Sequence, residues 1–158
     1  MKIDKKKLII CLLIPLAGGA LSGFISRGGM EAFEQLNQPP LSPPGWLFPV
    51  VWTILYLMMG LASYLVATSD EAFPHEINSA LTVYGIQLAM NFVWPILFFN
   101  LEMRLLAFFW LVHIWLLILL TIRLFKDISP TAAKLMIPYL LWVTFAGYLN
   151  MYVYLLNR

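Results

Sequence analysis

Residues 105–125 read LLAFFWLVHIWLLILLTIRLF, with one charged side chain, Arg123, near the end of the run. A helix needs about 20 mostly apolar residues to cross the hydrocarbon core of a bilayer, so this stretch predicts a transmembrane helix. Strands of an outer-membrane barrel would instead show alternation over about ten residues, and this run is continuous. The stretch therefore places the chain in a membrane and makes helices its structural elements.

Four further runs of the same kind flank this stretch, over residues 8–25, 46–67, 79–99 and 131–156. Together the runs predict an all-α membrane protein, a bundle of five transmembrane helices forming a single domain over residues 1–158. Most connections are short, so successive helices should be antiparallel neighbours. The longer connection, 27–44, is expected to act as a lid or binding loop. Ser129 is expected to cap the last helix, with Pro130 at its first position.

The composition excludes several classes of protein. Of the 158 residues, 61% are hydrophobic and only 11% are charged, and the mean hydropathy is +0.82. Soluble domains carry about 25% charged residues, so the composition indicates a membrane protein. Five spans of about 20 residues use roughly 100 residues, which leaves too few for a separate soluble domain. A single cysteine rules out an intrachain disulfide and a cysteine-based zinc site. The net charge of +2 is too small to indicate a nucleic-acid partner.

The basic residues predict how the chain is oriented. An odd number of spans places the two termini on opposite sides of the membrane. With the N-terminus inside, the inner segments carry Lys2, Lys5, Lys6, Lys7, Arg123, Lys126 and Lys134, and the outer segments carry Arg27, Arg104 and Arg158. Inner loops usually carry the excess of Lys and Arg, which favours this orientation.

Polar side chains within the third run share one helical face. Gln87, Asn91 and Trp94 lie at positions i, i+4 and i+7, and Pro95 must loosen the backbone hydrogen bonds that follow. Polar groups inside a membrane usually face the bundle interior or a cavity. The stripe is equally compatible with hydrogen bonds between helices and with a ligand site.

Two other faces carry aromatic residues at helical spacing. The second run aligns Pro49, Trp52 and Tyr56, and the last run aligns Trp142, Ala146, Leu149 and Asn150. A tryptophan near mid-span needs a partner for its indole N–H. Taken separately, each face is more typical of aromatic packing between helices. Beside the amide stripe, however, the two faces suggest a pocket lined by flat rings.

Other motifs leave the function open. His113, in the middle of the fourth run, is expected to be a neutral imidazole bonded to a neighbouring helix. A Ser–His–Asp arrangement, a phosphate-binding loop and an acidic pair within the spans are all missing from the sequence, so a hydrolase, an ATPase or a metalloenzyme is unsupported. Small residues at four-residue spacing, Gly19 with Gly23 and Gly85 with Ala89, permit close helix contact within the chain or between two copies.

Three motifs in order along the chain carry a family resemblance. They are QPPLSPPGWLFPVVW at 38–52, NFVWPILFF at 91–99 and PYLLWVTFAGYLN at 138–150. With them the chain closely resembles the translocator protein family, also called tryptophan-rich sensory protein or peripheral benzodiazepine receptor. The resemblance covers the chain from the region of Pro15 to Asn150.

The resemblance implies a multi-pass protein, commonly a homodimer, in what we expect to be a bacterial cell membrane. It implies a receptor or sensor whose cavity binds porphyrins such as protoporphyrin IX, haem and synthetic benzodiazepine-site ligands, beneath the loop after the first helix. Carried over by motif, the cavity should include Gly23, Ser26, Phe48, Pro49, Trp52, Asn91, Trp94, Trp142, Ala146 and Leu149. The faces described above add Tyr56 and Gln87. His113 aligns with a pocket-lining position that is usually aliphatic in the family, and it is expected to touch ligand.

The small-residue pair Gly85 and Ala89 is our candidate for the dimer interface. The family's sterol motif is altered here: Met151 and Leu155 stand where the aromatic and the basic residue would align, and Leu149, Tyr154 and Arg158 offer only a shifted match. Sterol binding is therefore a weaker expectation than porphyrin binding. Two alternatives remain, a light- and oxygen-dependent porphyrin-degrading enzyme and a passive transporter of porphyrin or sterol. The sequence predicts no catalytic residue, cofactor or metal site.

Overall fold

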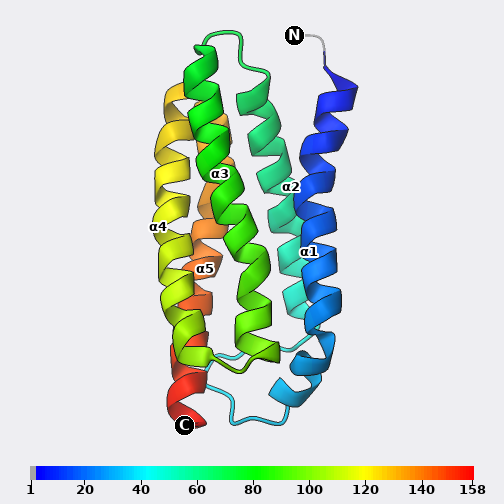
Figure 1. Cartoon of the computed structure of the whole chain (residues 1–158), viewed down its shortest axis with the longest axis vertical. Helices are drawn as coiled ribbons and strands as arrows, with labels where there is room; N and C mark the ends of the chain where they lie inside the picture. The colour runs from blue at the N-terminus through cyan, green and yellow to red at the C-terminus, as the bar shows by residue number, and fades with distance from the viewer. Residues whose placement is uncertain (1–2) are drawn as a thin grey trace.

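The computed structural model describes residues 3–158, and it is an elongated bundle whose long helices run side by side along one axis (Figure 1). The elements are α1 (Lys5–Phe33), α2 (Leu47–Ala67), α3 (Pro74–Pro95), the π-helix η1 (Ile96–Asn100), α4 (Arg104–Ile128) and α5 (Pro130–Leu156). Among the described residues, five helical segments, with α3 and η1 counted as one, are long and apolar enough to cross a membrane, and there is no strand. The predicted class, an all-α membrane protein with five transmembrane helices, is confirmed.

Helix starts follow local capping chemistry. Ser129 accepts a hydrogen bond from the backbone N–H of Ala132 at 3.3 Å, and Pro130 opens α5, as predicted. At the start of α3 the Glu76 carboxylate accepts from the Phe73 backbone N–H at 2.9 Å. With Pro74 at the first helical position, this cap begins α3 well before residue 79. Hydropathy alone missed the first turn because that turn is polar.

The first helix extends further than the sequence predicted. It continues through Gly28 and Gly29 to Phe33 instead of ending at residue 25, so the loop before α2 spans residues 34–46. Arg27 and Glu31 end the apolar run, but they do not end the helix. Its last turns are held because the Phe33 ring packs on the rings of Phe98 and Phe99. The segment 27–44 is therefore part helix and part loop.

Contacts between the helices close into a ring in the order α1, α2, α5, α4, α3 and back to α1. The two ends of the chain lie at opposite ends of the bundle, and the loop between α1 and α2 shares its end with the C-terminus (Figure 1). Lys2, one of the residues behind the predicted orientation, lies outside the described residues. Large apolar side chains cover the outer surface, such as Leu13 on α1, Leu116 on α4 and Leu141 on α5. In a bilayer these side chains would contact lipid.

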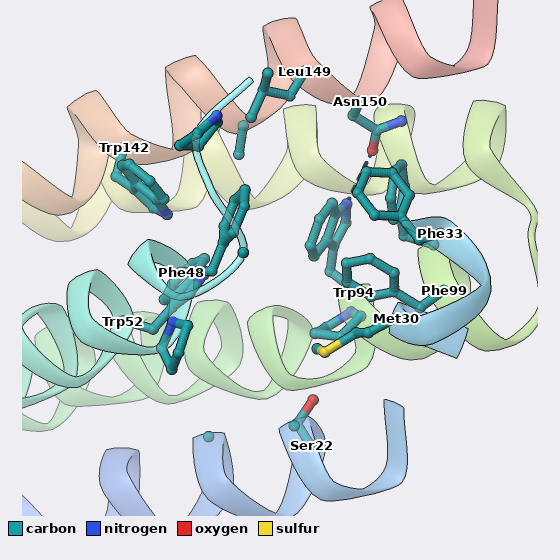
Figure 2. Close-up of a pocket in the computed structure, with 18 of the residues that line it drawn as sticks. Ser22, Met30, Phe33, Phe48, Trp52, Trp94, Phe99, Trp142, Leu149 and Asn150 are labelled. Atoms are coloured by element: carbon teal, nitrogen blue, oxygen red, sulfur yellow. Dashed lines mark hydrogen bonds between the residues drawn. The ribbon is translucent and has the colours of Figure 1, made fainter. Parts of the chain in front are cut away.

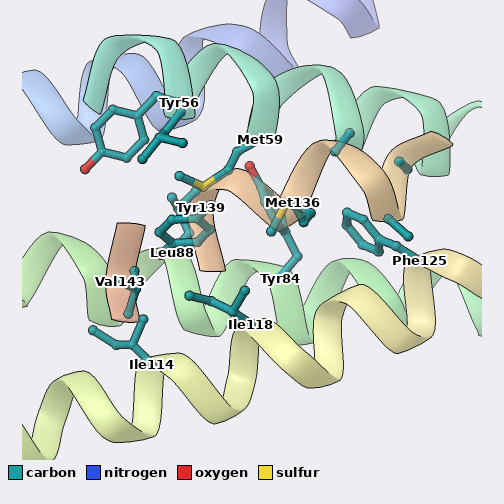
Figure 3. Packing of buried hydrophobic residues seen from close by; sticks show 14 of the residues in the cluster. Tyr56, Met59, Tyr84, Leu88, Ile114, Ile118, Phe125, Met136, Tyr139 and Val143 are labelled. Carbon is teal, nitrogen blue, oxygen red and sulfur yellow. The ribbon is translucent and has the colours of Figure 1, made fainter. Parts of the chain in front are cut away.

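Close packing is concentrated in the half of the bundle near the N-terminus. Tyr84, Phe125 and Met136 come from three different helices and meet there with little or no exposed surface (Figure 3). Because lipid tails are as apolar as these side chains, helices in a membrane are held by van der Waals contact and hydrogen bonds more than by burial of apolar surface. This end of the bundle therefore serves as the packed base of the molecule.

At Gly60, helix α2 passes close to the backbone of α1. A Cβ atom added there would lie 2.7 Å from the Cys11 carbonyl oxygen and 2.9 Å from the Leu12 Cα. Both neighbours are backbone, so a helix would have to move. We expect Gly60→Ala to lower the free energy of unfolding by about 1–3 kcal/mol, measured as a lower Tm in detergent.

The control for this prediction is Gly28→Ala, because no described atom lies within 4 Å of a Cβ added at Gly28. Alanine is the better helix former by about 1 kcal/mol, so this variant should be neutral or slightly stabilising. Equal losses of Tm in the two variants would contradict the assigned contact.

Candidate ligand-binding cavity

A cavity of about 870 Å³ occupies the half of the bundle near the C-terminus. Its walls come from α1, α2, α3, η1 and α5, and the α1–α2 loop contributes Glu34, Gln38, Ser42, Pro43 and Gly45. Helix α4, which is described throughout, contributes no lining residue. Ligand pockets in proteins usually measure about 300–1,000 Å³, so this cavity has room for a large organic molecule.

The structure brings most of the sequence-predicted site residues together here. Figure 2 shows Phe48, Trp52, Trp94, Trp142 and Leu149 reaching in from three helices. The predicted residues that line the cavity are Gly23, Phe48, Pro49, Trp52, Tyr56, Asn91, Trp94, Trp142, Ala146 and Leu149. The converging faces inferred from helical spacing thus form one concave surface.

Three predicted residues do not line the cavity. Ser26 and Gln87 are fully buried. His113 lies on the exposed outer face of α4, where its Nδ1 is 2.8 Å from the Phe109 carbonyl oxygen of its own helix. Both expectations for His113, a bond to a neighbouring helix and a place in the pocket, are corrected by the position of α4 outside the cavity wall.

An aromatic cluster that the sequence did not reveal lines the cavity near η1. The Trp94 ring stacks on Phe98 at 5.0 Å, and Phe33 lies 5.5 Å from Phe98 and 5.4 Å from Phe99. The α-helical spacing that starts at Gln87 fails after Pro95, because the chain continues as a π-helix closed by Leu101 N–H to Ile96 O at 2.9 Å. Pro95 was the available signal, since proline removes a backbone donor from the helix.

Asn150 holds the Trp94 indole in place. Its Oδ1 accepts from Trp94 Nε1 at 3.1 Å, and its Nδ2 donates to the Arg104 carbonyl oxygen at 2.8 Å. The first of these bonds is drawn in Figure 2. One buried amide thereby ties α3 and the start of α4 to α5 and fixes the angle of a cavity wall.

Apart from Trp46 in the α1–α2 loop, the tryptophans divide into two groups by the partner of their indole N–H. Trp94, Trp110 and Trp115 each donate to a protein oxygen, at 3.1, 2.8 and 2.8 Å. Trp52 and Trp142 line the cavity, and within residues 3–158 neither of their N–H groups has a hydrogen-bond partner. The cavity therefore holds two donors that a bound molecule can use.

A chain of polar side chains runs from the cavity into the core. Tyr56 donates its hydroxyl to Asn91 Oδ1 at 2.8 Å, and Asn91 Nδ2 donates to the Tyr139 oxygen at 2.9 Å. Tyr139 in turn donates to Gln87 Oε1 at 2.7 Å. Tyr56 and Asn91 line the cavity, whereas Tyr139 and Gln87 are completely buried. The two amides thus bond to other helices, and one of them also borders the cavity.

The α1–α2 loop is fastened to α5 next to the cavity. Asn37 and Asn157 exchange two hydrogen bonds of 3.0 Å, from Asn37 N–H to Asn157 Oδ1 and from Asn157 Nδ2 to the Asn37 carbonyl oxygen. The Tyr148 hydroxyl donates to the Pro40 carbonyl oxygen at 2.8 Å. These contacts hold the loop in place over the end of the cavity.

Breaking the Asn37–Asn157 pair is expected to open the loop more often. Asn157→Ala removes both bonds, and we expect ligand to dissociate several-fold faster, because lid opening often sets release rates. Stopped-flow displacement of a bound aromatic ligand measures this rate. Asn157→Asp keeps the acceptor for Asn37 N–H and should fall between alanine and the wild type. Unchanged dissociation in Asn157→Ala would show that the pair does not hold the lid.

The remaining predicted residues are scattered. Of the shifted sterol motif, Leu149 faces the cavity, Tyr154 lies outside it and Arg158 is exposed at the end of the chain. Gly19 lies against the Tyr56 ring, which leaves no room for a Cβ atom, so this glycine serves packing within the chain. Gly85 and Ala89 are exposed on α3.

Comparison with known proteins gives a consistent set of relatives. The model of the TspO/MBR family matches residues 11–156. Tryptophan-rich protein TspO of Chlorobaculum tepidum is 37% identical over 148 residues, which cover 94% of this chain and 91% of that protein. Translocator protein of Ovis aries is 37% identical over 139 residues, 87% and 82% of the two chains. Tryptophan-rich sensory protein of Cereibacter sphaeroides is 35% identical over 127 residues, 80% and 77% of the two chains.

Proposed function

The chain belongs to the TspO/MBR family, and from this premise we propose that it is a membrane receptor or sensor that binds porphyrins, such as protoporphyrin IX and haem, in the cavity. The observation that carries the proposal is an 870 Å³ cavity walled by flat rings. With the N-terminus inside, as the basic residues favour, the cavity would lie toward the outer side of the membrane.

The chemistry of the cavity suits a flat macrocycle with a polar edge. Phe48, Trp52 and Trp142 offer ring surface, and aromatic pairs gain about 0.5–1.5 kcal/mol beyond simple burial. The unpaired indole N–H groups of Trp52 and Trp142 can donate to carboxylate or carbonyl oxygens. The same combination supports binding of synthetic benzodiazepine-site ligands, which carry aromatic rings and hydrogen-bond acceptors.

The test is a titration of the purified protein with protoporphyrin IX, following the quenching of tryptophan fluorescence. We expect saturable quenching with one site per chain. Trp142→Phe keeps an aromatic ring but removes one donor, and it should weaken binding about tenfold. Trp115→Phe is the control, because Trp115 donates to Thr144 and does not line the cavity. Equal affinities in the two variants would count against the cavity as the binding site.

We also propose that two copies associate through α3. Gly85 and Ala89 are exposed at four-residue spacing, and no described atom lies within 4 Å of a Cβ added at Gly85. Small residues at this spacing let two helices approach closely. Gly85→Leu is expected to convert dimers to monomers, measured as protein mass by light scattering in detergent. Gly28→Leu, at an equally open glycine of α1, should leave the mass unchanged, and dimers in both variants would contradict this interface.

A further inference from the structure

Gln87 is completely buried outside the cavity, yet it ends the hydrogen-bond chain that starts at the cavity wall. The chain runs Tyr56, Asn91, Tyr139, Gln87, with donor–acceptor distances of 2.7–2.9 Å. Within the described part of the chain, the Nε2 of Gln87 has no partner. A buried polar atom without a partner costs free energy, and either amide orientation leaves one, Nε2 as observed or Oε1 after a half-turn, so neither orientation is strongly preferred on this ground.

In the observed arrangement every donor points toward Gln87. Tyr139 gives its proton to Gln87 Oε1, so its oxygen can only accept from Asn91. Asn91 must then turn its Oδ1 toward Tyr56, whose proton is engaged in that bond. The Tyr56 hydroxyl can therefore offer a bound molecule only a lone pair.

Rotating both amides by half a turn reverses the whole chain without moving any ring. Gln87 Nε2 would donate to Tyr139, Tyr139 to Asn91 Oδ1, and Asn91 Nδ2 to Tyr56. The reversed chain pairs Gln87 Nε2, which the observed chain leaves without a partner, and leaves Gln87 Oε1 unpaired instead. It also releases the Tyr56 proton, which becomes free to donate into the cavity. A hydroxyl and an amide both carry donor and acceptor groups, so each link works in either direction.

We propose that Gln87 is a positioning residue that lets the polar wall of the cavity switch between accepting and donating a hydrogen bond. The inference rests on the proposed ligand-binding function and adds a ligand class to it. A ligand with a carbonyl or carboxylate oxygen selects the reversed chain, and a ligand with an N–H, such as a pyrrole, selects the observed one. The wild-type protein thus accepts flat aromatic ligands of both kinds.

Three tricyclic probes of nearly equal shape separate these two states. Fluorene has no polar group, 9-fluorenone adds an acceptor and carbazole adds a donor. Equilibrium binding of radiolabelled probe to the purified full chain gives two ratios, fluorenone to fluorene and carbazole to fluorene. The infrared carbonyl stretch of bound fluorenone reports directly whether a donor reaches its oxygen. We expect both ratios to exceed one in the wild type.

Gln87→Met removes the acceptor of the Tyr139 proton at nearly constant volume. Tyr139 can then satisfy its proton only by donating to Asn91, which fixes the reversed chain. We expect the carbazole ratio to fall about tenfold while the fluorenone ratio does not fall and its carbonyl stretch stays shifted. Gln87→Glu is the conservative control, because a neutral carboxyl group also carries a donor and an acceptor. Both ratios should stay within about twofold of the wild type.

The route through Tyr139 is tested by a double-mutant cycle. In a Tyr139→Phe background, Gln87→Met should change neither ratio, because the link to Asn91 is already broken. Equal weakening of all three probes by Gln87→Met would overturn the inference and leave Gln87 a structural residue. An effect that persists in the Tyr139→Phe background would overturn the route. Failure of all three probes to bind the wild type would also overturn the inference, and protoporphyrin quenching in the same preparation shows whether the proposed function fails with it.

Discussion

Ala146→Phe is expected to abolish protoporphyrin binding, with a loss of affinity of at least about a hundredfold. Ala146 lines the cavity on α5, one turn from Trp142 and one turn from Asn150. Its small side chain leaves the space that a flat ligand would fill, and a benzyl group there would occupy that space. A hundredfold loss corresponds to about 2.8 kcal/mol, and fluorescence titration measures it.

Leu141→Phe provides the matched control for Ala146→Phe, because it adds the same ring outside the cavity. Leu141 lies on the same helix with 65% of its surface exposed, on the side that would face lipid. The same ring added there should leave both affinity and Tm unchanged. Normal protoporphyrin affinity in Ala146→Phe would mean that the ligand binds elsewhere on the molecule, and the cavity would lose its assigned role.

Asn150→Leu is expected to produce the largest loss of stability of any single change near the cavity. The Asn150 side chain is completely buried and makes two hydrogen bonds, to Trp94 and to the Arg104 carbonyl. Leucine has a similar size but removes both bonds and leaves the Trp94 N–H without its acceptor, and an unsatisfied buried donor costs about 1–3 kcal/mol. We expect the Tm in detergent to fall by several degrees or more.

A second tryptophan hydrogen bond gives the comparison. Thr144→Val removes the acceptor of the Trp115 N–H, but this pair lies on the exposed side of α5. The loss of Tm should therefore be much smaller than in Asn150→Leu. Similar losses in the two variants would show that burial does not govern the strength of these bonds.

The part of the site that could be predicted lies on regular helices. Trp52 and Tyr56, Asn91 and Trp94, and Trp142 and Ala146 follow α-helical spacing, which fixes a shared face from sequence alone. The resemblance to a known family then indicated that these faces meet around one cavity. The fold class followed from the apolar runs, because a membrane leaves helices and closed barrels as the available structures.

The rest depended on irregular backbone and on packing. Phe98 and Phe99 reach the cavity through a π-helix, whose spacing no α-helical pattern reproduces. Phe33 lies on turns of α1 beyond the apolar run, where hydropathy carries no signal. Gln87 shares the Asn91 face by spacing, but only the packed structure places it behind Tyr139. The alignment with the family wrongly placed His113 in the cavity wall, because α4 contributes no lining residue.

Mutations are expected to have different effects in the packed base of the bundle and in the half that contains the cavity. Residues such as Phe125 and Met136 are completely buried, and most changes there should unfold the protein. Residues that only face the cavity, such as Phe48 and Ala146, should tolerate many exchanges of ring size with the fold intact, whereas Asn150 should not, because its amide bonds two other helices. Substitutions that reshape the cavity can therefore accumulate at one end without loss of the folded frame at the other. Uneven packing thus separates the residues that hold the fold from those that shape the cavity.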